Sequence, residues 1–211
     1  LGKMECWYIL DAKEGGTIVI GHNAKNHEEV EEMIRGKKWK EFIREIPVKK
    51  GDFFQINPGC VHAIKGGTLI LETQQNSDIT YRVYDYDRAD KNGKKRERHF
   101  DKTVQVMNMD VATDVKQKSR MVRYYPGSSR ELLCRCKYFE TERIQVKKGF
   151  SFFVMNNSFQ VLMCLDGYGQ VETMDAEQKP MRFSKGETIF LPAGIGRCLV
   201  LGDASLLKIR C

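Results

Sequence analysis

A short segment occurs twice in related form, at residues 50–62 and 185–197, and it constrains the fold more than any other feature of the sequence. Each copy begins with Lys-Gly and an acidic residue, continues through an apolar run, and reaches a proline shortly before a second glycine. The two glycines have the same separation in both copies. Glycine with an acidic residue suits a tight turn, and the proline and second glycine turn the chain back. The repeat therefore predicts two related β-units.

The two copies differ at one chemically important position, where His62 of the first stands opposite Arg197 of the second. The first copy resembles the second conserved motif of the cupin barrels, in which a histidine after the Pro-Gly turn points into the barrel and binds metal. This resemblance implies that the second copy, which lacks the ligand, is structural. A lone histidine on a strand is more often a packed or surface residue than a ligand, so the surrounding residues decide.

The length of 211 residues suits either one large all-β domain or two units of roughly 100 residues each. Short apolar runs joined by glycine-containing turns favour a mainly β fold of two cupin-like β-barrel (jelly-roll) units, at 1–115 and 116–211. The predicted strands lie at 6–10, 17–20, 52–56, 68–72, 79–84, 132–139, 143–146, 150–155, 160–165, 170–174, 187–191 and 198–201.

A helical insertion is predicted within the first unit, at about 26–46. Asn26 followed by Glu29 resembles a capping box at the start of a first helix. A second short helix is expected to end at Pro47, and no other helix is predicted. The helical spacing rests on Val30, Met33 and Ile34 for the first helix and on Trp39, Phe42, Ile43 and Ile46 for the second.

Composition indicates a soluble globular protein, with 41% hydrophobic and 30% charged residues. No uninterrupted apolar run approaches the roughly 20 residues that span a bilayer, so no membrane association is expected. The first residues show no export signal, and a cytoplasmic location is therefore predicted. The seven cysteines form no C-x-x-C pair and are interpreted as reduced thiols.

The net charge of +7 is concentrated in residues 91–99, which carry five positive charges and one negative charge. Asn92-Gly93 within this run predicts a solvated turn. Nucleic-acid binding is not expected, because the basic residues are neither interleaved with aromatics nor spread along a helix face. An attraction for anionic small molecules is consistent with the charge.

Polar residues gather in the sequence two predicted strands after His62. Alternate residues of a strand share a face, so Glu72 and Gln74 are expected to point the same way. The same rule groups Arg82 with its neighbours Thr80 and Tyr84 on the next predicted strand. The sequence thus predicts carboxylates, an amide and a guanidinium beside a histidine.

Three motifs in order resemble type I mannose-6-phosphate isomerase in its short bacterial form, and the resemblance covers the whole chain. They are Gly-Lys-Met-Glu-Cys-Trp-Tyr at 2–8, Pro-Gly-Cys-Val-His-Ala-Ile at 58–64, and the run from Leu-Glu-Thr-Gln-Gln to Tyr-Arg-Val-Tyr-Asp at 71–85. The resemblance implies zinc as the cofactor, held in the family by a Gln-x-His pair, a glutamate and a further histidine. Glu5 matches that glutamate, and His62 matches the further histidine.

The same resemblance implies roles for four other side chains. Lys3 and Arg82 match positions of the family's active site, and Glu72 and Asp78 match acidic positions beside its substrate pocket. The implied activity interconverts mannose 6-phosphate and fructose 6-phosphate through an enediol, with zinc polarising the oxygens and Arg82 stabilising the enediolate. Lys3, Glu72 and Asp78 are all candidates for the proton carrier, and the sequence does not select the residues that bind phosphate.

The sequence departs from the family in one respect, since it contains no Gln-x-His. Family members carry roughly a further third of their length before this region, including that pair. Two of four zinc ligands are therefore lacking, and Glu5 with His62 cannot close a tetrahedral site. His22, His27 and His99 are poor substitutes because they lie in loop-like or helical contexts.

Two classes of function follow from these observations. The first is a sugar-phosphate isomerase whose activity in this truncated form is open, and the alternative is a non-catalytic cupin module that binds carbohydrate or serves a structural role. An iron-dependent cupin dioxygenase is disfavoured because it would need more histidines. The expected partner is a small sugar phosphate, and an open sheet edge would favour self-association.

Overall fold

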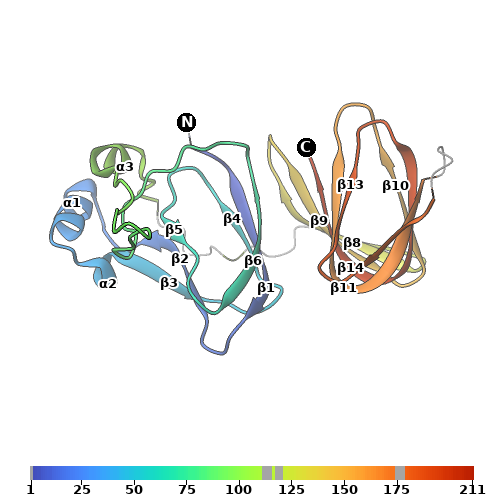
Figure 1. Ribbon diagram of the computed structural model, residues 1–211, viewed down its shortest axis with the longest axis horizontal. Coiled ribbons are helices and arrows are strands. Elements are labelled where there is room, and N and C mark those ends of the chain that lie inside the picture. Colours follow the sequence, from blue (N-terminus) through green and yellow to red (C-terminus); the bar gives the residue numbers. More distant parts are fainter. Residues whose placement is uncertain (1, 111–115, 117–120, 174–178) are drawn as a thin grey trace. The chain divides into compact units, whose positions relative to one another are not determined.

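The computed structural model describes residues 2–110, 116, 121–173 and 179–211, and the chain forms two compact units, Leu1–Gln117 and Lys118–Cys211 (Figure 1). The boundary predicted near residue 115 lies outside the described residues. The mainly β fold predicted from the sequence is confirmed in both units. No helix among the described residues has the length and apolar character needed to cross a membrane.

The first unit contains two three-stranded antiparallel sheets, ordered β4-β1-β6 and β3-β2-β5. Trp7 and Ile9 from one sheet pack against Ile18 and Ile20 from the other, so the two sheets enclose a common apolar core. The helices that the structure describes in this unit gather on the side of β2 and β3 (Figure 1). The elements of this unit are β1 (Glu5–Ala12), β2 (Thr17–His22), α1 (His27–Arg35), α2 (Trp39–Phe42), β3 (Ile43–Pro47), β4 (Phe53–Ile56), β5 (His62–Ala63), β6 (Thr68–Gln74) and α3 (Phe100–Val106).

The first predicted helix is confirmed as α1, whereas the second is shorter than predicted. Asn26 caps α1 by accepting a hydrogen bond from the Glu29 backbone N–H at 2.8 Å. The prediction of helix through Ile46 is wrong, because α2 ends at Phe42 and the chain continues as β3. Ile46 lies opposite Ile18 of β2 and packs on the core between the sheets. Pairing with β2 thus prevails over the local helical spacing.

Helix α3 was not predicted. Its apolar residues Phe100 and Val104, with Met107 directly after its end, contact the cluster formed by α1 and α2. Their spacing of four and three residues is a helical signal that the neighbouring charged run obscured.

The predicted strand at 79–84 is also wrong, because this segment forms no strand. The backbone hydrogen bonds that the structure gives Arg82 both run to His99 rather than to a neighbouring strand. Consecutive residues from Ile79 to Tyr86 line one cavity, so the alternation expected for Thr80, Arg82 and Tyr84 does not apply.

The second unit is built on an eight-stranded antiparallel sheet that includes the path β12-β11-β14-β9-β8-β7. The separate strands predicted at 160–165 and 170–174 are one long strand, β11, with a register shift between Cys164 and Asp166. Side chains from six of its strands form one core. The elements are β7 (Met121–Tyr125), β8 (Ser128–Arg135), β9 (Glu140–Val146), β10 (Gly149–Val154), β11 (Gln160–Thr173), β12 (Met181–Ser184), β13 (Thr188–Leu191) and β14 (Gly196–Arg210).

The backbone geometry of the two repeat copies is the same. Gly51 and Gly186 both have φ of +89°, and Gly59 and Gly194 have φ of +82° and +80°. The N–H of Gly51 donates to a carbonyl of β1 and that of Gly186 to a carbonyl of β11, both at 2.9 Å. These positive φ values explain why glycine recurs at both positions.

The repeat supplies a matched pair of substitutions. A Cβ on Gly59 would lie 2.4 Å from the backbone oxygen of Val106, whereas a Cβ on Gly194 would lie 2.4 Å from the side-chain oxygen of Asn156. Gly194→Ala is expected to lower the free energy of unfolding by about 1 kcal/mol through left-handed strain. Gly59→Ala should cost about 2 to 3 kcal/mol, because backbone must also move. Urea unfolding detected by hydrogen exchange can measure each unit separately, and equal losses would contradict the backbone clash.

Candidate functional site

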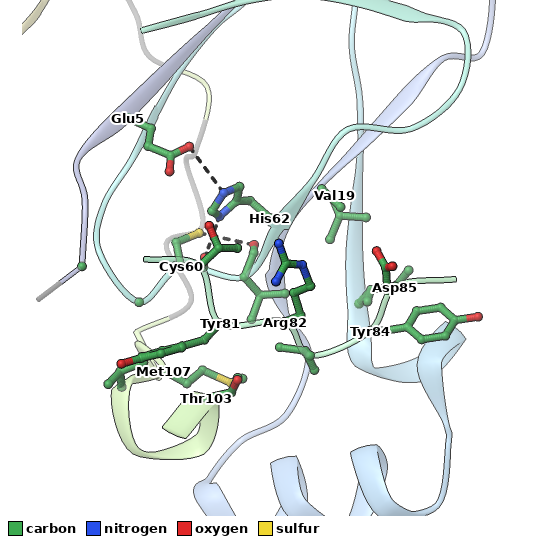
Figure 2. A pocket seen from close by; sticks show the side chains of 18 of the residues that line it. Glu5, Val19, Cys60, His62, Tyr81, Arg82, Tyr84, Asp85, Thr103 and Met107 are labelled. Atoms are coloured by element: carbon green, nitrogen blue, oxygen red, sulfur yellow. Dashed lines mark hydrogen bonds and ion pairs between the residues drawn. The ribbon is translucent and has the colours of Figure 1, made fainter. Parts of the chain in front are cut away.

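A cavity of about 820 Å³ lies within the first unit, a volume that suits a small-molecule ligand. The strands β1, β5 and β6 provide one side, and the segment that includes residues 79–86 provides another. Figure 2 shows Glu5, His62 and Arg82 directed toward this space. Five of the six predicted site residues line it, namely Lys3, Glu5, His62, Glu72 and Arg82, whereas Asp78 is exposed and is not among the lining residues.

Glu5 and His62 meet at the base of the cavity. The carboxylate of Glu5, from β1, is almost fully buried, and its Oε2 lies 3.5 Å from His62 Nε2 (Figure 2). The turn before β5 places the Cys60 carbonyl 2.9 Å from His62 Nδ1. Burial disfavours protonation of the ring, but hydrogen bonds with Glu5 and the Cys60 carbonyl raise the pKa of His62. When Nε2 gives up its proton, it presents a lone pair beside the carboxylate, which is the form that binds a metal ion.

Lys3 neutralises part of the Glu5 charge. Its Nζ lies 2.9 Å from Glu5 Oε1 and also donates a hydrogen bond to Gln74. Burial opposes ionisation of Glu5, but hydrogen bonds from His62, Glu72 and Lys3 outweigh it and lower the pKa of Glu5 to about 2. Glu5 is therefore a permanent anion at neutral pH.

Glu72, unlike Glu5, ionises less readily than a carboxyl group in water. It lies opposite Trp7 in the β1–β6 pair and accepts a hydrogen bond of 3.0 Å from the Trp7 indole N–H. The same indole meets the His62 ring edge to face, with centroids 5.4 Å apart. Burial, followed by the hydrogen bond with Glu5, raises the pKa of Glu72. Two neighbouring carboxyl groups with pKa values moved apart are a common basis for acid and base roles.

Arg82 contributes an unpaired cation. Its backbone is held by His99, and its side chain reaches into the cavity (Figure 2). Within the part of the chain that the structure describes, its guanidinium forms no hydrogen bond or ion pair. A partly buried guanidinium without a carboxylate partner is suited to an anionic ligand.

Two further arginines, which sequence reasoning did not select, lie at the same cavity. The buried carboxylate of Asp85 pairs with Arg88 at 2.5 Å and accepts from Arg96 Nε at 2.8 Å. Arg96 and then Arg88 hold the pKa of Asp85 well below its usual range. Two guanidinium groups against one carboxylate leave this end of the cavity positive. The basic run at 91–99 was the only available signal, because its pairing with Asp85 depends on the fold.

The residues of the cavity do not by themselves complete a tetrahedral zinc site. Glu5 and His62 supply two donors, and no group of three or more His, Cys, Asp or Glu that could hold a metal occurs among residues 2–110, 116, 121–173 and 179–211. A structural or catalytic zinc needs three or four protein ligands. The ammonium of Lys3 also competes for Glu5.

The second unit has a different set of residues at the corresponding positions. Glu5 pairs with Ile56 of β4 just as Gln160 pairs with Leu191 of β13, so Gln160 occupies the place of Glu5. Arg197 stands opposite His62 in the repeat, and the residues that follow them, Ala63 and Cys198, pair with Val19 of β2 and Thr173 of β11. Nearby interior positions hold an ion pair between Lys208 and Glu142. This unit has lost both candidate metal ligands.

Fold and cavity together define a two-unit cupin protein with a polar, cationic cavity in its first unit. The family model described as "Mannose-6-phosphate isomerase, cupin domain" matches residues 129–211. The putative mannose-6-phosphate isomerase YvyI and the mannose-6-phosphate isomerase ManA of Bacillus subtilis are each 37% identical to 98% of this chain. The chain is therefore similar over almost its whole length to mannose-6-phosphate isomerases.

Solved structures show the same similarity. The crystal structure of mannose 6-phosphate isomerase from Bacillus subtilis has a TM-score of 0.87 and 34% identity over 99% of this chain. A mannose 6-phosphate isomerase described as bound with zinc and yttrium has a TM-score of 0.71 at 11% identity, which shows the fold alone. The chain spans 64% of the length of both Bacillus subtilis relatives and 65% of the crystallised chain.

Proposed function

We propose that this chain provides the substrate cavity of a zinc-dependent enzyme that interconverts mannose 6-phosphate and fructose 6-phosphate. The observation that carries the proposal is the convergence of Glu5, His62, Glu72 and the unpaired Arg82 on one cavity of suitable volume. Relatives named as mannose-6-phosphate isomerases support the choice of substrate.

Aldose–ketose isomerisation moves a proton between C2 and C1 and develops negative charge on the carbonyl oxygen. Glu72 is proposed as the proton carrier, because it lines the cavity and its raised pKa makes the carboxylate a stronger base. Lys3 is engaged by Glu5 and Gln74, and Asp78 does not line the cavity. The Arg82 guanidinium is proposed to stabilise the developing oxyanion.

The substrate phosphate is proposed to lie near Arg88 and Arg96. Both guanidinium groups reach the cavity, and their shared carboxylate Asp85 cannot neutralise them fully. Arginine is suited to phosphate because its planar donors form paired hydrogen bonds.

Zinc remains part of the proposal through Glu5 and His62, which would supply two of its ligands. A fold neighbour is described as binding zinc, but this cavity alone holds only half of a tetrahedral set. The other ligands would come from the segment of the relatives that the match does not cover.

Joining the chain to the segment of the Bacillus subtilis enzyme that lies outside the match tests the activity directly. The fused protein is expected to interconvert mannose 6-phosphate and fructose 6-phosphate, and His62→Ala is expected to abolish that activity. His27→Ala, on the exposed surface of α1, is the matched control and should leave activity unchanged. Specific binding of the sugar phosphate without turnover would instead support a non-catalytic cupin module.

Zinc affinity gives a separate prediction. The fused protein should bind zinc at least about 1,000-fold more tightly than the chain alone, because a closed ligand set contributes most of the binding free energy. Competition with a chromophoric chelator measures both constants. Equal affinities would contradict the division of the ligand set between the two segments.

A further inference from the structure

Helix α3 is attached at its two ends to the two segments that carry cavity side chains. His99, the residue before the helix, contacts the segment that contains Arg82. Asn108, just beyond the helix, contacts the turn that precedes His62. The helix thus connects two parts of the cavity wall that are far apart in the sequence.

The connection at the start of α3 is a reciprocal pair of hydrogen bonds. The backbone N–H of His99 donates to the Arg82 carbonyl at 3.1 Å, and the backbone N–H of Arg82 donates to His99 Nδ1 at 3.3 Å. Because Nδ1 accepts, the ring proton of a neutral His99 is assigned to Nε2, which faces Glu97 at 3.8 Å. The His99 ring therefore does not cap its own helix, as polar residues at this position usually do.

Arg82 depends on this attachment because no strand holds its segment. The backbone hydrogen bonds that the structure gives Arg82 both run to His99. Its guanidinium has no partner among the described residues that could fix it from the other end. The His99 side chain is only 18% exposed and packs against the Tyr81 ring at 5.7 Å, so its own position is well defined.

The connection at the end of α3 runs to the metal-ligand turn. The Asn108 N–H donates to the Gly59 carbonyl at 2.9 Å, and the buried His22 ring lies 3.2 Å from the Asn108 carbonyl through Nε2. Gly59 belongs to the repeat turn that leads to His62. Movement of α3 would therefore change the separation between Arg82 and His62.

We propose that His99 is a positioning residue. Its Nδ1 accepts a hydrogen bond from the Arg82 backbone and thereby holds the Arg82 side chain in place to act on the substrate. The effect rests on the proposed isomerase function, whereas the attachment itself is a property of the folded chain. An error of about 1 Å in the position of a charged group is enough to cost up to about 100-fold in rate.

Three variants separate the hydrogen bond from packing. His99→Asn places an amide oxygen near the position of Nδ1 and should preserve the bond to Arg82. His99→Gln places its oxygen nearer to the position of Nε2, and His99→Leu removes the acceptor. All three replace the ring that packs on Tyr81, so a purely structural role predicts similar losses in each.

In the fused protein, His99→Gln and His99→Leu are expected to lower kcat about 10- to 100-fold with KM within about 3-fold of the parent value. His99→Asn should remain within about 3-fold of the parent kcat. In an Arg82→Met background, His99→Leu should have little additional effect, because both changes act through one group. Equal losses in His99→Asn and His99→Leu would overturn the proposal.

Hydrogen exchange of the Arg82 amide in the chain alone gives a readout that does not require activity. Protection of this amide should fall in His99→Gln and His99→Leu and be retained in His99→Asn, with the exchange of β1 amides unchanged. Protection that is unaffected by His99→Leu would overturn the positioning role even if the enzyme is active. The expected exchange pattern in a protein without isomerase activity would refute the proposed function and leave the attachment established.

Discussion

Replacing Glu142 with glutamine is expected to lower the free energy of unfolding of the second unit by about 3 to 5 kcal/mol. Its carboxylate lies 2.9 Å from Lys208 Nζ and 2.5 Å from Arg130, and the Lys208 side chain is only 5% exposed. Burial already lowers the pKa of Lys208 while Glu142 opposes that shift. Without the carboxylate, a buried ammonium would lack its counter-ion, which is among the most costly single changes in a protein interior.

The pH dependence of this loss has a definite sign. A lysine whose pKa is lower in the folded than in the unfolded state binds fewer protons when folded, so stability increases as the pH rises toward the unfolded value. Glu142→Gln should lower the pKa of Lys208 further. The difference in the free energy of unfolding between Glu142→Gln and the parent chain should therefore become smaller between pH 7 and pH 10, as measured by urea unfolding detected by hydrogen exchange.

Two comparisons identify the cause of the loss. The double variant Glu142→Leu with Lys208→Met removes both charges and should recover much of the stability. Asp203→Asn breaks an exposed pair with Lys147 and should cost less than about 1 kcal/mol. A double variant as unstable as Glu142→Gln would show that the uncompensated charge of Lys208 is not the cause, and would leave packing or the unpaired Arg130 as the source of the loss.

The repeat was the part of the fold that the sequence predicted best, because backbone conformation at its glycines is set locally. Gly51 and Gly186 must adopt positive φ in any chain that makes this turn, so their pattern is visible without tertiary information. The helical spacing at Ile43 and Ile46 was equally visible but misleading. Whether these residues form a strand depends on their pairing with β2, and the sequence of the segment alone does not show that pairing.

The candidate site, like the fold, was predicted from the sequence only in part. Glu5, His62 and Arg82 were chosen from motifs, and the fold brings all three to one cavity. The contribution of Arg96 was not predictable, because it depends on a loop that folds back onto Asp85. The attachment of Arg82 to His99 was likewise hidden, since a histidine before an unpredicted helix gave no signal of its own.

The second unit shows how a repeat can retain a fold without its chemistry. Gln160 and Arg197 replace the candidate ligands Glu5 and His62 in the same backbone frame. In the interior of this unit, Lys208 and Glu142 form a buried ion pair. Conservation of turn geometry therefore identifies architecture, whereas the side chains at the strand ends identify the unit that carries a site.

Replacing Arg82 with methionine is expected to lower kcat/KM of the fused protein by about 100- to 1,000-fold, with most of the loss in kcat. The reason is that an unpaired guanidinium in the cavity contributes most when negative charge develops on the substrate. Arg82→Lys should recover only part of the rate, because an ammonium lacks the planar donors of arginine. Arg182→Met, on the exposed surface of the second unit, is the matched control and should change kcat/KM by less than about 2-fold.

The division between kcat and KM distinguishes Arg82 from the arginines proposed to bind phosphate. Arg88→Met should mainly raise KM, since a phosphate contact is equally strong in the ground state and the transition state. Steady-state assays over a range of mannose 6-phosphate concentrations, repeated with fructose 6-phosphate, measure both constants in each direction. If Arg82→Met instead raised KM with kcat unchanged, Arg82 would be the phosphate ligand, and the oxyanion would have to be stabilised from the side of the cavity that carries Lys3 and His62.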